Sequence, residues 1–194
     1  MELNPTEFKK SYISRLIELL KGLEKQDVES VISSFEGARE SGRKILFIGN
    51  GGSAATASHF ANDLGYGTRT WQKPFRALAL TDNVAVLTAI ANDYAYDEVF
   101  TKQLQVIMRP GDVLVAISAS GNSPNVVKAV EYAKSCGNET IGLVGFDGGK
   151  LAALCAKKIL VETKKGEYGP VEDVHMVIDH LIGAYLMQKI RSTQ

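Results

Sequence analysis

The sequence predicts an α/β fold: an αβα sandwich with a five-stranded parallel sheet, preceded by a helical extension. Five short apolar runs, each about the length of a strand, recur between residues 44 and 162. Helix-length amphipathic segments lie between these runs. Strands that alternate with helices are joined by right-handed crossovers, and this connection produces a parallel sheet covered on both faces.

The chain opens with two amphipathic helices within residues 1–41. Apolar side chains recur at helical spacing from Phe8 to Leu23 and again from Val28 to Ala38, with a polar break between the two stretches. We expect these helices to pack on the same body or on a neighbouring subunit.

The remaining elements follow in regular alternation. Strands are expected at KILFIGN (44–50), RALALTD (76–82), DVLVAIS (112–118), TIGLVGF (140–146) and KKILVE (157–162). Helices are expected at 53–65, 83–106, 123–136, 149–155 and 170–190. No linker rich in Pro, Gly or Ser divides residues 40–194, so we predict a single domain over residues 1–194.

The composition argues against several classes of binding partner. The 22 Lys and Arg residues balance 22 Asp and Glu, which gives no electrostatic reason to bind nucleic acid or an anionic membrane directly. No apolar run approaches the roughly 20 residues needed to span a bilayer. The segment Met1–Pro5 is too polar to begin a signal peptide. We therefore expect a cytoplasmic protein without a membrane partner.

Two serine-rich turns follow strands in this plan, at Gly49–Ser53 and Ser118–Pro124. In a doubly wound sheet the ligand lies beyond the carboxyl ends of the strands. Ser53 and Ser123 are suited to cap the helices that follow, so hydroxyl groups and free amides would meet at helix N-termini. This arrangement suits a phosphate monoester on a small metabolite.

The alternative is that both serine-rich stretches are only tight turns. Neither turn matches GxxxxGK[ST] or GxGxxG, so no nucleotide cofactor is expected.

Titratable side chains gather in two helical segments. His59 and Asp63 are four residues apart on one helix face, and the closing segment carries Glu172, His175, Asp179 and His180 among apolar residues. The alternative for each histidine is an ordinary hydrogen-bonded role in the core. The histidines and carboxylates suit either a Zn²⁺ site or metal-free proton transfer.

Glu172 and His180 are eight residues apart, or about 12 Å along a continuous helix. If both belong to one site, either Glu172 precedes the regular helix or the two residues come from different subunits. The second option predicts a symmetric oligomer with sites at its interfaces.

The chain resembles the sugar isomerase (SIS) domain family and, within it, the phosphoheptose isomerases. The matching stretches are GNGGSxxxxxHFAxxL at 49–64, AIAND at 89–93, GDVLVAISASGNSPNV at 111–126, GFDGGK at 145–150 and the closing EDVHMVIDH at 172–180. The resemblance implies the SIS-type αβα sandwich and a homotetramer with active sites shared between subunits. It also implies conversion of sedoheptulose 7-phosphate to D-glycero-D-manno-heptose 7-phosphate, which feeds heptose synthesis for surface polysaccharide.

Site residues carry over position by position from this resemblance. The phosphate-binding set is Ser53, Ser118, Ser120 and Ser123, and the sugar pocket includes Asn50, Arg69 and Asp93. The set expected to take part in catalysis is His180, Asp63, Glu172 and Asp93. Where a family member carries zinc, its four ligand positions match His59, Asp63, Glu172 and His180.

Three positions depart from the family pattern. Asp63 stands where a glutamate is usual, Glu172 where a glutamine is usual, and Ala119 replaces a threonine. Because Glu172 can exchange protons and glutamine cannot, the carboxylate that carries the reaction is either Asp63 or Glu172. The competing function is a non-catalytic SIS protein, of the kind that associates with the replication initiator DnaA. Such proteins lack a histidine at the position of His180, which this chain retains.

Overall fold

The structure is a computed structural model that describes residues 4–192, so the first three residues of the predicted N-terminal helices lie outside it. It confirms the predicted α/β class. All five strands are parallel, in the spatial order β2-β1-β3-β4-β5. Their bounds are β1 Lys44–Gly49, β2 Arg76–Ala79, β3 Val113–Ser118, β4 Glu139–Phe146 and β5 Lys157–Glu162.

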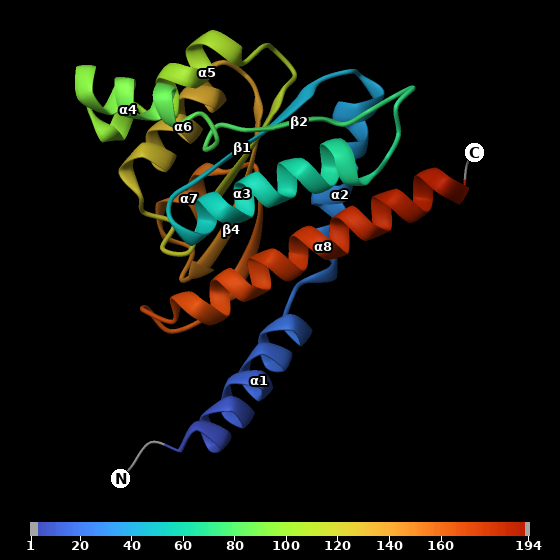
Figure 1. Ribbon diagram of the computed structural model, residues 1–194, viewed down its shortest axis with the longest axis vertical. Helices are drawn as coiled ribbons and strands as arrows, with labels where there is room; N and C mark the ends of the chain where they lie inside the picture. Colours follow the sequence, from blue (N-terminus) through green and yellow to red (C-terminus); the bar gives the residue numbers. More distant parts are fainter. Residues whose placement is uncertain (1–3, 193–194) are drawn as a thin grey trace.

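Helices cover both faces of the sheet (Figure 1). One layer holds α2 (Lys25–Glu40), α3 (Gly52–Asn62) and α8 (Tyr168–Ser192), and the other holds α4 (Val84–Asp93), α5 (Thr101–Ile107), α6 (Pro124–Ser135) and α7 (Gly149–Leu154). Alternate strand residues supply the two cores, as the pleat requires. Ile45 and Phe47 pack with α2, α3 and α8, whereas Leu46 and Ile48 pack on the opposite side.

The structure divides two segments that were expected as single helices. Residues 83–106 form α4, a 3₁₀ turn at Tyr96–Glu98, and α5. This division follows Asn92 and Asp93, whose side chains favour turns over helix interiors. The first helix after β1 passes into a π-helix at Asp63–Gly67, where two glycines weaken the regular helix.

A further correction concerns how α3 begins. Gly51, with φ of +54°, occupies the N-cap position, and Ser53 lies inside the first turn. Ser53 therefore does not cap the helix as expected. A positive φ is readily adopted by glycine and rarely by other residues, which accounts for Gly51 at this position.

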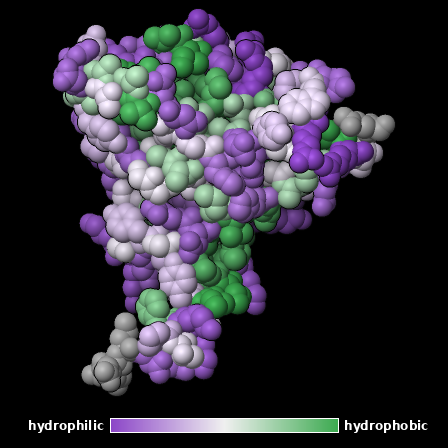
Figure 2. All heavy atoms as spheres, viewed as in Figure 1, coloured by the Kyte–Doolittle hydropathy of each residue, from purple (hydrophilic) through white to green (hydrophobic). Residues whose placement is uncertain are grey.

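Helix α1 (Pro5–Lys21) projects away from the rest of the chain in Figure 1. The Tyr12 hydroxyl donates a 2.6 Å hydrogen bond to Asp173 of α8, which fixes one point of contact. Apolar side chains along α1 remain about half exposed, namely Phe8, Ile13 and Ile17. Figure 2 shows apolar surface along this projecting helix.

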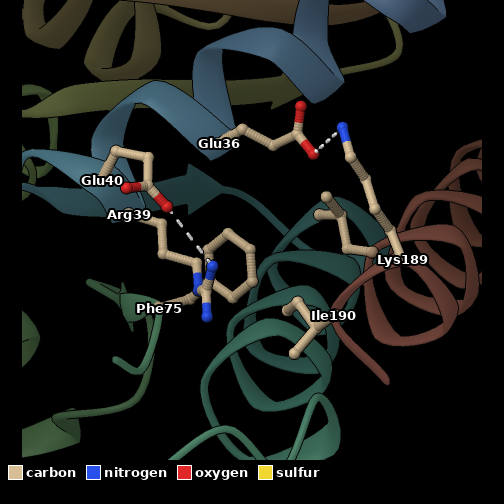
Figure 3. A pocket seen from close by; sticks show the side chains of 7 residues that line it. Glu36, Arg39, Glu40, Phe75, Lys189 and Ile190 are labelled. Carbon is tan, nitrogen blue, oxygen red and sulfur yellow. Dashed lines mark ion pairs between the residues drawn. The ribbon is translucent and has the colours of Figure 1, made fainter. Parts of the chain in front are cut away.

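The far end of α8 lies beside α2 at a hollow of about 310 Å³, where one ion pair joins the two helices (Figure 3). Lys189 forms an ion pair with Glu36, and Arg39 pairs with Glu40 and lies over the ring of Phe75. We interpret this hollow as space left between packed helices. Within residues 4–192, no helix is long and apolar enough to cross a membrane.

Candidate functional site

The two serine-rich turns lie next to each other at the centre of the sheet. From β1 the chain passes to β2 on one side, whereas β3 lies on the other side of β1 and leads on to β4 and β5. The carboxyl ends of β1 and β3 therefore flank the point where the winding reverses, which is where such folds bind ligands. A cavity of about 160 Å³ opens there, and its lining includes Asn50, Ser53, Ser118, Ser120 and Ser123.

The cavity is suited to an anion. The N-termini of α3 and α6 both begin in the turns that line it, and a helix N-terminus carries partial positive charge and free amides. Ser123 is the N-cap residue of α6 and Pro124 its first residue, as expected, although the Ser123 side chain makes no capping hydrogen bond. Its hydroxyl instead lies 3.4 Å from that of Ser118. Both hydroxyls are thus placed to serve a ligand in the cavity.

Glu172 reaches the same cavity from α8. A Cβ atom on Gly52 would lie 2.2 Å from Oε2 of Glu172, so the carboxylate rests against the first turn of α3. A carboxylate is stabilised at a helix N-terminus but repels a second anion bound there. Within one chain, Glu172 therefore belongs to the serine cavity.

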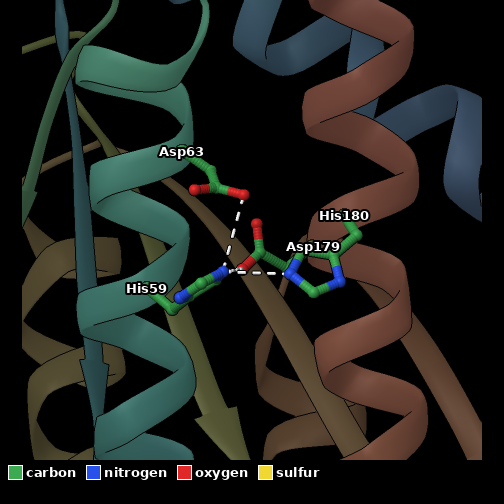
Figure 4. Close-up of side chains that lie close together, drawn as sticks. All are labelled: His59, Asp63, Asp179 and His180. Atoms are coloured by element: carbon green, nitrogen blue, oxygen red, sulfur yellow. Dashed lines mark hydrogen bonds and ion pairs between the residues drawn. The ribbon is translucent and has the colours of Figure 1, made fainter.

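A second group of polar side chains forms where α3 and α8 run side by side (Figure 4). His59 and Asp63 come from α3 and the start of the π-helix, and Asp179 and His180 come from α8. Nε2 of His59 lies 2.9 Å from Nε2 of His180, 3.6 Å from Oδ2 of Asp63 and 4.0 Å from Oδ2 of Asp179. One ligand atom from each residue lies within 4.8 Å of those of the other three.

The four members of this cluster differ in their surroundings. Asp179 is fully buried, and neither of its carboxylate oxygens has a hydrogen-bond partner in the part of the chain that the structure describes. Burial, together with the nearby charge of Asp63, raises the pKa of Asp179 to about 8. His180 is exposed, and a shallow cavity of about 320 Å³ opens beside it and Asp63. The cluster thus has a buried wall and an open face.

Three of the four residues expected to bind zinc come together in one chain, namely His59, Asp63 and His180. Glu172 does not join them. Helix α8 is continuous from Tyr168 to Ser192, so the idea that Glu172 precedes the regular helix is wrong. An arrangement in which Glu172 reaches this cluster from another subunit stays a prediction.

The sequence interpretation did not assign Asp179 to the site, and one signal pointed to it. Its neighbours on the buried stripe of α8 are apolar, including Val171, Ile178 and Ile182. An acidic residue on such a stripe is seldom placed there without a partner. His175 interrupts the same stripe, and burial lowers its pKa to about 4.

The residues expected to line the sugar pocket are dispersed in one chain. Asn50 lies in the serine cavity, where its side chain accepts a hydrogen bond from the Tyr96 hydroxyl. Arg69 is exposed beyond the π-helix, in a left-handed backbone conformation with φ of +50°. Asp93 is exposed at the end of α4. Their part in substrate binding stays a prediction.

Comparison with known proteins agrees with this fold. The sequence model of the SIS domain matches residues 10–145, so the chain belongs to the SIS domain family. Within that family it belongs to the phosphoheptose isomerases. The chain is 46% identical over 141 residues to the phosphoheptose isomerase of Nitratidesulfovibrio vulgaris strain Hildenborough, covering 73% of this chain and 67% of that one.

Two further comparisons extend over nearly the full length of both chains. The probable phosphoheptose isomerase of Thermoplasma acidophilum is 36% identical over 180 residues, covering 93% of this chain and 98% of the relative. The structure of phosphoheptose isomerase GmhA from Neisseria gonorrhoeae superposes with a TM-score of 0.83 at 33% identity, covering 94% and 98% of the two chains. The predicted family and αβα fold are confirmed.

Proposed function

We propose that this protein is an aldose–ketose isomerase that converts sedoheptulose 7-phosphate to D-glycero-D-manno-heptose 7-phosphate. One observation carries the proposal: the anion cavity and the histidine–carboxylate cluster lie along the same helix pair. From Ser53 to His59 is six residues, or about 9 Å along α3. An extended seven-carbon sugar phosphate is of comparable length, so its phosphate and its reacting carbons can reach the two sites together.

The reaction moves a proton between C1 and C2 through a cis-enediol. The serine hydroxyls and the free amides of the two helix N-termini hold the phosphate. One group then removes the carbon-bound proton, while another donates a proton to the carbonyl oxygen. Without a bound metal, Asp63 and His180 supply such a pair on the open face of the cluster. Because Glu172 lies at the phosphate end of its own chain, its place favours Asp63 as the catalytic carboxylate.

We further propose that the enzyme works as a cytoplasmic homotetramer with shared active sites. The exposed apolar side chains of the projecting α1 support an assembly. Arg69 and Asp93, which are exposed in one chain, would then complete a sugar pocket at an interface. A cytoplasmic location suits the substrate, because a phosphorylated sugar does not cross a membrane unaided.

The cluster also suits a divalent metal. Histidine nitrogens and carboxylate oxygens are the donor types that Zn²⁺ accepts, and the buried carboxylate of Asp179 has no hydrogen-bond partner among residues 4–192. A bound zinc would polarise the oxygen atoms of the substrate. His59, Asp63 and His180 are the residues that would hold it on the exposed side.

Proton exchange with solvent tests the reaction class and the substrate together. The protein is incubated in D₂O with sedoheptulose 7-phosphate and, separately, with pentose and hexose phosphates, and proton NMR follows each sample. We expect deuterium at C2 of a heptose 7-phosphate, and we expect His180→Gln to abolish its appearance. Absence of exchange with every sugar phosphate would contradict an isomerase and favour a binding protein.

Ser120→Ala tests the anion cavity. Loss of one hydroxyl that bonds to a charged phosphate should weaken sugar-phosphate binding by about 1.5 to 3 kcal/mol, measured by calorimetry. Ser135→Ala is the control, since Ser135 is exposed near the C-terminal end of α6, away from the cavity. Equal affinity in the two variants would count against the phosphate assignment.

A further inference from the structure

We propose that Asp179 is the fourth ligand of a divalent metal ion, so that a single chain holds the ion between α3 and α8 without Glu172. The ion would bind to His59, Asp63, Asp179 and His180. The proposal rests on the proposed function, because it concerns the acid–base end of the same site. It assigns a ligand role to a residue outside the set that the family resemblance implies.

The spacing of the four side chains supports the proposal. Zinc bonds to nitrogen and oxygen of about 2.0–2.1 Å, in a tetrahedron, place neighbouring ligand atoms about 3.3 Å apart. The distances from Nε2 of His59 to His180, Asp63 and Asp179 are 2.9, 3.6 and 4.0 Å, which lie on both sides of that value. All four ligand atoms lie within 4.8 Å of one another, so modest side-chain adjustments would bring them to a common centre.

The surroundings of Asp179 give an independent argument. Its carboxylate is fully buried, and both oxygens are without a hydrogen-bond partner among residues 4–192. Buried polar side chains nearly always have partners, and buried charges are paired or bind metals. In Figure 4 the Asp179 carboxylate points toward His59 and His180. A cation among these side chains would supply the missing partner.

The position of Glu172 completes the argument. Its carboxylate lies against Gly52, and it is seven residues before Asp179, or about 10 Å along the continuous α8. It cannot reach an ion that touches His59 of the same chain while it lines the serine cavity. A site completed by Asp179 therefore needs no carboxylate from a second chain.

Metal titration of the full chain tests this assignment without substrate. The protein is freed of metal with a chelator, and Zn²⁺ binding is followed by calorimetry against a competing chelator. We expect one zinc per chain, and a loss of affinity on the order of 100-fold in Asp179→Asn. Glu172→Gln should bind zinc like the wild type, as should Asp173→Asn, which removes an exposed carboxylate from the same helix.

A second variant reports directly on the ligand position. Asp179→Cys places a thiolate at this position, and titration with Co²⁺ should produce a thiolate-to-cobalt charge-transfer band that the wild type lacks. Circular dichroism of each metal-free variant establishes that it is folded.

The proposal would be overturned by wild-type zinc affinity in Asp179→Asn, by a loss of zinc in Glu172→Gln, or by no charge-transfer band in Asp179→Cys. Because none of these measurements uses a sugar, absence of isomerase activity would leave them unaffected. Conversely, an active enzyme that binds no zinc would overturn this proposal alone.

Discussion

At the scale of single residues, Glu172 and Asp179 show how surroundings divide two acidic side chains on one helix. Glu172 lies against the first turn of α3 and lines the serine cavity. Asp179 is buried and lies near the charge of Asp63, and both raise its pKa, to about 8. The first residue is placed to influence phosphate binding, and the second to share a proton or a cation.

Glu172→Gln separates binding from catalysis. Removing a negative charge beside the phosphate should lower KM by about fivefold, which corresponds to about 1 kcal/mol of repulsion. With Asp63 as the catalytic carboxylate, kcat should stay nearly unchanged, whereas Asp63→Asn should lower it by about 10²–10⁴. Steady-state kinetics on both variants measures this. A comparable fall of kcat in Glu172→Gln would show that Glu172 had taken over proton transfer.

His175 predicts an acid-sensitive fold. Burial lowers its pKa to about 4, against 6.5 for an ordinary histidine, although the Val144 backbone partly opposes the shift. Between these pH values the unfolded chain binds a proton that the folded chain does not, so the free energy of unfolding falls as the pH falls. The fall should reach about 3 kcal/mol between pH 6.5 and 4.

Urea unfolding at several pH values measures this contribution. The variant His175→Met replaces the titrating ring with an apolar side chain of similar size. The difference between the two proteins cancels the other titrating groups, and the wild type should lose about 3 kcal/mol more than His175→Met as the pH falls from 6.5 to 4. Parallel pH profiles for both proteins would contradict the assignment.

At the scale of elements, the second serine-rich turn depends on close backbone packing. Gly121 has φ of +62°, and a Cβ atom there would lie 2.0 Å from the carbonyl oxygen of Gly148. Gly137, after α6, has φ of +73° and no neighbour within 4 Å of such an atom. The two glycines therefore separate the cost of a left-handed conformation from the cost of a collision.

Gly121→Ala should destabilise the fold by at least about 3 kcal/mol, because strain at positive φ and displacement of the Gly148 backbone add together. Gly137→Ala should cost about 1 to 2 kcal/mol, from the conformation alone. Denaturant unfolding gives both values. Equal losses would mean that the turn yields easily and that its shape is not fixed by the contact with Gly148.

Elements with a clear period were predictable from the sequence. Apolar runs and helical spacing predict the five strands, α6 and the long α8. Because the strands are parallel, the two serine-rich turns are expected at the same edge of the sheet. The break of residues 83–106 and the π-helix were not predicted, because the apolar pattern continues through them. Asp179 was overlooked as a site residue because only the packing of α3 against α8 places it beside His59.

At the scale of the whole molecule, apolar side chains are exposed at several places among residues 4–192, including α8, where Val177, Leu181 and Tyr185 recur every fourth residue. Two more places are α1, with Phe8, Ile13 and Ile17, and the surface over α4 and α5, where Val84 and Val106 are 68% and 72% exposed. Figure 2 shows apolar surface in both places. Exposed apolar areas that are contiguous mark interaction sites, and a helix of this length gains little stability from its own hydrogen bonds alone. We therefore expect α1 to be packed against another copy of the chain.

Lysines on α1 test this assembly. Ile13 and Ile17 are 49% and 47% exposed and lie one turn apart on the same face, so replacing both with Lys places two charges in the expected interface. Light scattering at micromolar concentration should give a tetramer for the wild type and a smaller species for Ile13→Lys/Ile17→Lys. Ser11→Lys/Glu18→Gln makes the same change of charge at exposed positions of another face and should stay tetrameric. A wild-type monomer, or equal masses for both double variants, would remove α1 from the interface.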